Sequence, residues 1–211
     1  MMTLHGFDVA ELVPVPWKNG GGTTREIVCV PRDAGFDRFA WRASIATIAG
    51  DAAFSIFPGV DRVIALLHGP AVHLHGTGGT GHRLDLPAAS LAFDGAAAVR
   101  ATLLGPGAAC VLNVMARRGT WAATIRVVRD AQALPRATGG VLYVAAGAWC
   151  VESDASGVAV WSKGQGGWWD GCRGPVRLTP RVPASVLLAA LLTRASDQDS
   201  GSAASSAPRD V

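Results

Sequence analysis

Long apolar runs, lysines and closely spaced cysteines are scarce or missing in this chain of 211 residues. It has no run of 18 apolar residues, the length that a membrane-spanning helix requires. Its first residues include Asp8 and Glu11, whereas a signal peptide has a cationic start and an apolar core. We therefore expect a cytoplasmic protein without a membrane partner.

Lysine occurs only at Lys18 and Lys163, and singly scattered arginines supply most of the basic charge. The formal net charge is +3. A nucleic-acid-binding surface needs a basic stripe, and the one short pair, Arg117 and Arg118, occurs without a helix-turn-helix pattern. We expect no nucleic-acid partner.

Several catalytic signatures are also missing. The sequence has no G-x-S-x-G elbow, no Walker-type loop and no close pair of carboxylates in a shared block. Its four cysteines lie far apart without a C-x-x-C pair, which argues against a zinc knuckle or a thioredoxin-like site. We interpret them as small, buried apolar residues.

Short apolar or alternating segments, separated by Gly, Pro and Asp, recur along the chain, which is 49% hydrophobic and long enough to bury a sizeable core. Many short strands at this spacing predict an all-β sandwich or barrel. Residues 184–192 would also fit a short helix. The expected strands are 25–30, 39–48, 61–67, 71–75, 90–93, 99–104, 109–116, 121–128, 141–145, 148–152, 157–161 and 185–192.

The second half of the chain offers little chemistry. Its notable residues are tryptophans, which are more often packing residues than ligand contacts. The segment Gly164–Trp169 is interpreted mostly as a loop with apolar anchors. These tryptophans are Trp149, Trp161, Trp168 and Trp169.

The densest set of functional groups lies in Trp17–Glu26, which holds an aromatic ring, a cation, an amide and three consecutive glycines. Ordered glycines cost backbone entropy, so they indicate positive φ angles or a close approach to the main chain. The segment fits a glycine-rich turn before a strand, or a nest of backbone N–H groups that binds an anion.

Strand parity places Arg42 and Ser44 on one face of their strand and Trp41, Ala43 and Ile45 on the other. An inward Arg42 would be a costly buried cation unless an acid or an anionic ligand paired with it. Exposure of that face to solvent is the alternative.

Arg62 precedes the apolar run Val63–Leu67, which is continuous enough to be buried on both faces. We therefore expect Arg62 at the rim of a barrel. The turn at Pro58 and Gly59 could hold Phe57 over the mouth of a pocket.

Convergence of Arg25, Arg42 and Arg62 would create a carboxylate site, because guanidinium groups bind carboxylates through two parallel hydrogen bonds. The alternative is that each arginine forms a structural ion pair. The acids available for such pairs are Glu26, Asp51 and Asp61.

Asn113 shares a strand face with Val111, Met115 and Arg117. An inward asparagine offers a donor and acceptors that could orient an amide, formyl or imidazole group. A core asparagine bonded to a neighbouring loop is an equal alternative.

His73 and His75 lie on one face of a strand, and His82 with Asp85 could complete a set that binds a divalent metal. No glutamate follows where a cupin metal motif has one. An exposed strand face is the favoured interpretation, and metal binding is the alternative.

Four blocks resemble the HutD/Ves family, bacterial proteins of a double-cupin fold linked to histidine utilisation. The blocks are Val15–Ile27, Phe39–Ala46, Phe54–Arg62 and Leu112–Gly119. The resemblance implies two jelly-roll barrels of the RmlC type, each a double-stranded β-helix, and favours a closing strand at 184–192.

The implied bicupin would have a first barrel with a ligand pocket in residues 1–118 and a shorter second barrel in 119–194. Residues 195–211 lack an apolar anchor, and their composition predicts a disordered tail.

Our first hypothesis is a protein whose first barrel binds a small carboxylate without a metal or another cofactor, and the resemblance implies the nature of the ligand and the role. The expected ligand is an intermediate of histidine catabolism, N-formylglutamate or urocanate, and the expected role is to regulate or govern that catabolism. The residues expected to contact the ligand are Trp17, Lys18, Asn19, Arg25, Arg42, Ser44, Ser55, Phe57, Arg62 and Asn113.

Two other functions stay open. A metal-dependent cupin enzyme, an isomerase or a dioxygenase, would use His73, His75 and His82. A scaffold acting through protein contacts would use exposed strands, which could also form a homodimer.

Overall fold

The computed structural model describes residues 3–195 except 77–80, 86–88, 155–156 and 172–173. The tail expected at 195–211 lies, apart from Ala195, outside the described residues, as does Cys172. The predicted all-β class is confirmed, since the one helix of the described ranges is the short α1 (Gly35–Arg38). No helix in these ranges is long and apolar enough to cross a membrane.

The first barrel is built from a six-stranded sheet, β2-β3-β4-β11-β6-β9, and a four-stranded sheet, β5-β10-β7-β8. Aliphatic side chains of both sheets form one core between them. The strands are β2 (Pro14–Pro16), β3 (Gly22–Val30), β4 (Trp41–Ile48), β5 (Ala52–Ala53), β6 (Val60–His68), β7 (Val72–His75), β8 (His82–Leu84), β9 (Ser90–Asp94), β10 (Arg100–Leu103) and β11 (Ala109–Arg117).

The second barrel is built from a five-stranded sheet, β1-β17-β14-β19-β12, and a four-stranded sheet, β13-β18-β15-β16. Its own apolar core lies between these sheets. The strands are β1 (His5–Asp8), β12 (Trp121–Val128), β13 (Gln132–Ala133), β14 (Gly139–Ala146), β15 (Ala148–Ser153), β16 (Gly157–Ser162), β17 (Gln165–Asp170), β18 (Val176–Pro180) and β19 (Val186–Arg194).

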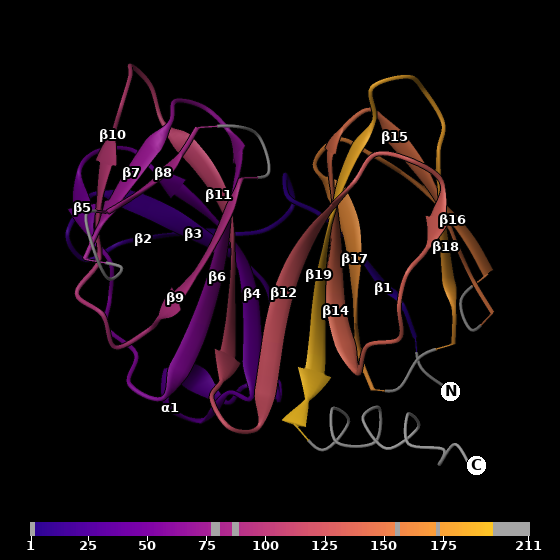
Figure 1. Ribbon diagram of the computed structural model, residues 1–211, viewed down its shortest axis with the longest axis horizontal. Coiled ribbons are helices and arrows are strands. Elements are labelled where there is room, and N and C mark those ends of the chain that lie inside the picture. Colours follow the sequence, from indigo (N-terminus) through magenta and orange to yellow (C-terminus); the bar gives the residue numbers. More distant parts are fainter. Residues whose placement is uncertain (1–2, 77–80, 86–88, 155–156, 172–173, 196–211) are drawn as a thin grey trace, which may run out of the picture.

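The N-terminal strand β1 crosses between the barrels. It pairs with β17 in the second barrel, although the chain then continues into the strands of the first (Figure 1). The two barrels are therefore joined both by the connection from β11 to β12 and by this early strand.

The two large sheets pack against each other in the middle of the molecule, where β12 lies beside β6 and β11 (Figure 1). A third apolar cluster fills this interface and includes Trp41, Ile45, Trp121 and Tyr143. The outward face of β4 is therefore apolar. Its inward face is the one that carries Arg42 and Ser44.

The segment Gly164–Trp169 is not the expected loop, because β17 runs through it and pairs with both β1 and β14. Its glycines are needed for close packing. A Cβ at Gly166 would lie 2.0 Å from the carbonyl oxygen of Leu142 on the neighbouring strand. The predicted closing strand at 184–192 is present as β19.

Candidate functional site

The candidate site consists of two neighbouring rows of side chains on the inner face of the six-stranded sheet. In the first row, Met115 pairs with Arg42 on one side and with Arg62 on the other. In the second row, Asn113 pairs with Ser44, and Ser44 in turn pairs with Glu26. Directly paired residues of adjacent strands point to the same face, so these polar groups gather at one end of the barrel.

Arg62 does not lie at the rim as predicted, because its side chain points into the barrel and the residue is only 7% exposed. Its Nη2 and Nε donate hydrogen bonds to Oδ1 of Asn113, at 2.9 and 3.3 Å. Nη1 donates to the carbonyl oxygen of Ser55 at 3.4 Å. The prediction failed because β6 already begins at Val60.

Aromatic rings surround the Arg62 guanidinium. Its central carbon lies 5.0 Å from the ring centre of Phe93, 5.1 Å from that of Phe54 and 5.9 Å from that of Phe57. Burial, together with the positive charge of Arg42, lowers the pKa of Arg62 to about 10. The ring faces partly compensate the cation, but they supply no negative charge.

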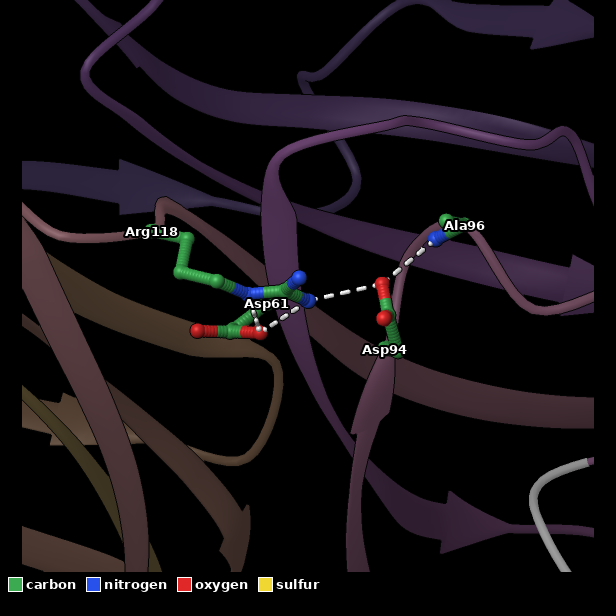
Figure 2. A network of polar contacts seen from close by, with 4 residues as sticks. All are labelled: Asp61, Asp94, Ala96 and Arg118. Carbon is green, nitrogen blue, oxygen red and sulfur yellow. Dashed lines mark hydrogen bonds and ion pairs between the residues drawn. The ribbon is translucent and has the colours of Figure 1, made fainter.

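No carboxylate of the described residues lies within ion-pairing distance of Arg62. The neighbouring Asp61 points outward, where Arg118 binds it at 2.6 Å and also binds Asp94 at 2.7 Å (Figure 2). Strand alternation thus separates Asp61 from Arg62 and leaves a buried cation bonded only to neutral oxygens.

Arg42 has the acidic partner that Arg62 lacks. Its Nε donates to Oε2 of Glu26 at 2.5 Å, and the Glu26 side chain is half exposed. The ring of Phe36, from α1, lies over the Arg42 guanidinium, with its centre 4.8 Å from the central guanidinium carbon. The ring centres of Phe36 and Phe57 are 5.7 Å apart. Phe36 and Phe57 therefore cover the outer end of the polar cluster.

Ser44 carries a hydroxyl group with no hydrogen-bond partner, although the residue is only 1% exposed. Its position lies between Glu26 and Asn113 in the second row. An unpartnered buried hydroxyl costs free energy unless something else bonds to it. A ligand in the barrel would supply such a partner.

Arg25 does not join this cluster. It pairs with Ile45, whose side chain lies in the interface between the barrels, so Arg25 faces away from Arg42 and Arg62. Its Nε is buried there without a hydrogen-bond partner. Two of the three expected arginines converge, and the third does not.

The other predicted contact residues support the site or lie outside it. Trp17 donates from Nε1 to the Thr24 hydroxyl at 2.8 Å and packs edge-on against Phe54. Lys18 is exposed. Ser55 is also exposed and reaches the cluster only through its carbonyl oxygen.

The glycine-rich segment is a tightly packed turn. Gly20 has a φ of +72°, and a Cβ at Gly22 would lie 2.1 Å from the carbonyl oxygen of Thr47. Asn19 fastens this turn, since its side-chain amide donates to the carbonyl oxygen of Ala53 and accepts from the Gly21 N–H. Positive φ and close approach are both confirmed here.

The three histidines of the alternative metal site do not all lie on one face of the sheet. His73 and His75 share a face, with ring centres 4.2 Å apart, but His82 pairs with Leu74 and so belongs to the opposite face of the sheet. Within the described ranges, no group of three His, Cys, Asp or Glu side chains could hold a metal ion.

Sequence reasoning missed the contributions of Phe36, Phe54 and Phe93 to the cluster. Parity offers a signal for Phe93, because it pairs directly with Arg62 on β9. Phe36 had no signal, since it is an exposed residue of a four-residue helix that no apolar pattern marks.

A depression of about 420 Å³ lies away from this cluster, at the junction of the barrels. His5 stacks there on Trp168 with ring centres 4.3 Å apart, and Arg32 lies 5.4 Å from the same ring. Its full lining is Thr3, His5, Val30, Pro31, Arg32, Trp168 and Asp170. Arg32 is exposed, so this depression has no buried charge that needs a ligand.

Two jelly-roll barrels, joined through their large sheets, define a bicupin. Oxalate decarboxylase of Bacillus subtilis shares this fold, with a TM-score of 0.59, 11% identity and coverage of 89% of this chain and 76% of that one. At such low identity the likeness concerns the fold alone.

The chain belongs to the HutD family, whose model matches residues 9–187. The Protein Ves of Citrobacter koseri is 42% identical over 146 residues, 68% of this chain and 73% of that protein. The Protein Ves of Cronobacter sakazakii is 38% identical over 163 residues, which are 77% of this chain and 85% of that protein. The resemblance seen in the four sequence blocks is confirmed.

Two solved structures agree with this assignment. A conserved protein of unknown function from Pseudomonas aeruginosa PAO1 has a TM-score of 0.79 and 26% identity, covering 90% of this chain and 99% of that one. HutD from Pseudomonas fluorescens SBW25 has a TM-score of 0.75 and 26% identity, covering 91% and 99%.

Proposed function

We propose that this protein binds a small carboxylate inside its first barrel and acts, without a catalytic metal, as a regulator of histidine utilisation. Urocanate and N-formylglutamate are the candidate ligands. One observation carries the proposal: Arg62 is a buried cation without a carboxylate partner, and it lies one row from the unpartnered hydroxyl of Ser44.

A buried charge costs several kcal/mol unless an opposite charge and good hydrogen bonds compensate it. Arginine has five N–H donors, and the three contacts of Arg62 go to only two neutral oxygens. A ligand carboxylate would supply the missing charge and accept the remaining donors. Asn113 and Ser44 would then orient the polar end of the ligand.

Access to Arg62 would be through the aromatic cover. Phe36 is 57% exposed and Phe57 is partly exposed, whereas Arg62 and Ser44 are buried. The short helix α1 has no buried residue and no side-chain cap, so little packing holds Phe36 in place. A ligand would need only this cover to move, and the barrel wall would stay intact.

Membership of the HutD family supports the assignment to histidine utilisation. The candidate ligands are intracellular metabolites, so the proposal includes a cytoplasmic location. The family name and the Arg62 cluster support different parts of the proposal: the name supports the biological setting, and the cluster supports the chemistry.

The first experiment measures thermal unfolding of metal-analysed protein with millimolar urocanate, N-formylglutamate, histidine and glutamate. A ligand that binds only the folded state stabilises it by about 2.7 kcal/mol at a hundredfold excess over its Kd. We expect a rise in melting temperature with a candidate acid. The shift should vanish in Arg62→Met and persist in Arg118→Met, in which an exposed arginine is lost instead.

No shift with any of the acids would contradict the proposed carboxylate site. Stoichiometric bound metal together with no shift would favour an enzyme whose metal ligands include residues outside the described ranges.

A further inference from the structure

We propose that the site selects monocarboxylates with a flat, apolar body over dicarboxylates. The inference rests on the proposed carboxylate site and names its ligand class. It follows from the way the charges of the cluster are already paired.

The inner cluster contains two cations and one carboxylate, Arg42, Arg62 and Glu26. Glu26 neutralises Arg42 through a direct ion pair, which leaves one unbalanced positive charge on Arg62. Asp61 does not enter this count, since it lies on the outer face with Arg118. One carboxylate group of a ligand therefore completes the charge balance of the barrel interior.

A second carboxylate would have no favourable position. Around Arg62 it would lie among the rings of Phe54, Phe57 and Phe93, where a charge loses its hydration without gaining a cation. Toward the mouth it would approach the half-exposed carboxylate of Glu26, which repels it.

Arg42 is already neutralised by Glu26, so a second carboxylate bonded to its other N–H donors would add an unbalanced negative charge. Its bond to Glu26 is a short, charge-assisted one, and the ring of Phe36 covers the guanidinium. A second carboxylate at Arg42 would also lie beside the Glu26 carboxylate, which repels it, so the dianion gains little.

The same surroundings favour a flat body. Phenylalanine rings bind planar unsaturated groups through stacked or edge-on contacts. The free hydroxyl of Ser44 can satisfy one neutral polar atom, such as a ring nitrogen, but it cannot neutralise a charge. Urocanate has this combination of one carboxylate and a flat ring, whereas N-formylglutamate has two carboxylates.

Isothermal titration calorimetry at pH 8 tests the selection with two pairs of probes. Urocanate is compared with N-formylglutamate, and monomethyl fumarate with fumarate, which differ by one charge at nearly equal size. In the full-length protein we expect each monocarboxylate to bind at least about tenfold more tightly than its dicarboxylate counterpart, which is about 1.4 kcal/mol.

The variant Glu26→Gln removes the carboxylate that occupies Arg42. We expect it to tighten the binding of N-formylglutamate by about tenfold or more and to change that of urocanate by less than about threefold. The control Asp61→Asn makes the same change in net charge one residue from Arg62, but on the outer face. It should leave the preference unchanged.

The double variant Glu26→Gln with Arg42→Met returns the interior to one net positive charge and should restore the preference for monocarboxylates. It also provides a readout if the single variant unfolds. Equal or tighter binding of the dicarboxylates to the unaltered protein would overturn the selection rule and leave the carboxylate site standing. Absence of binding by all four probes would overturn the proposed function itself.

Discussion

The first barrel buries two arginines, a serine and an asparagine on the inner face of its large sheet, whereas the second barrel fills its interior with apolar side chains. The buried polar residues of the second barrel that the structure describes are uncharged: Thr138, Ser153 and Ser185. Both barrels have the same two-sheet architecture. Their interiors, not their folds, distinguish them.

The second barrel shows that this architecture closes without buried charge. Trp149 and Trp169, both nearly inaccessible, occupy its core together with aliphatic residues. Apolar residues of similar volume commonly stabilise a protein as well as, or better than, a buried ionic group. The proposed carboxylate site would account for the arginines of the first barrel, and on that proposal substitutions in the two barrels should have opposite consequences.

The largest effect is expected from Trp169→Ala in the second barrel. The residue is 1% exposed, and its indole N–H donates to the carbonyl oxygen of Ala137 at 3.3 Å. Truncation leaves a cavity and an unpaired carbonyl, so the free energy of unfolding should fall by about 3–5 kcal/mol. Urea denaturation measures this loss. The fraction that stays folded should bind carboxylates with unchanged affinity.

Arg62→Met should show the reverse in the first barrel. Ligand affinity should fall by about 2–5 kcal/mol, because the ligand loses its charged partner. The free energy of unfolding should stay unchanged or rise by up to about 4 kcal/mol, since an uncompensated buried cation is replaced by an apolar side chain. Calorimetric titration and urea denaturation of the same preparation measure both quantities.

A large loss of stability in Arg62→Met would contradict the comparison. It would mean that the bonds from Arg62 to Asn113 and Ser55 hold the barrel together, and that the arginine is structural. Arg118→Met serves as the reference, because it removes an exposed arginine that is paired with two carboxylates.

Sequence reasoning predicted the fold class and part of the cluster because alternation along a strand is visible in the sequence. It placed Arg42 opposite Trp41 and Ala43, and the structure confirms that Trp41 and Ala43 face the second barrel. Alternation also requires Arg25 and Glu26 to face opposite ways, but it does not tell which of them points inward. The register with β4 decides that, and it places Glu26 inside.

The surroundings of Arg62 could not be predicted in the same way. Its burial depends on rings from two separate segments: Phe54 and Phe57 lie in the connection before β6, and Phe93 lies on β9. This approach of the rings is a long-range fact that a local pattern does not contain. The outward direction of Asp61, where Arg118 binds it, does follow from alternation along β6.

A matched pair of serines sharpens the comparison on a smaller scale. Ser44 is buried in the first barrel without a partner, whereas the hydroxyl of Ser185 in the second barrel donates to the carbonyl oxygen of Val182 at 2.7 Å and contacts the Ala148 backbone. Ser185→Ala should lower the free energy of unfolding by about 1–3 kcal/mol. Ser44→Ala should leave it unchanged or raise it by up to about 1 kcal/mol while weakening ligand binding.

Urea denaturation of the two serine variants, side by side, measures the difference in sign. Equal losses in both would indicate that Ser44 has a bonding partner in solution, such as an ordered water molecule, when no ligand is present.

The smallest effect concerns the outer face, where Arg118 binds Asp61 and Asp94 (Figure 2). The hydrogen bond from Arg118, with a second one from the Ala96 N–H, lowers the pKa of Asp94 below its ordinary value. The carboxylate therefore adds stability above its unfolded pKa of about 3.9, and this contribution disappears as the pH falls through the lower folded pKa. Asp94→Asn should have a slightly lower melting temperature than the unaltered protein at pH 7, and the two should converge near pH 2.

Because this network is exposed, the difference at pH 7 should also shrink in molar salt, whereas the binding contribution of the buried Arg62 should be far less sensitive to salt. A difference that persists unchanged at pH 2 would show that the bond to the Ala96 N–H, rather than the charge, stabilises the turn after β9.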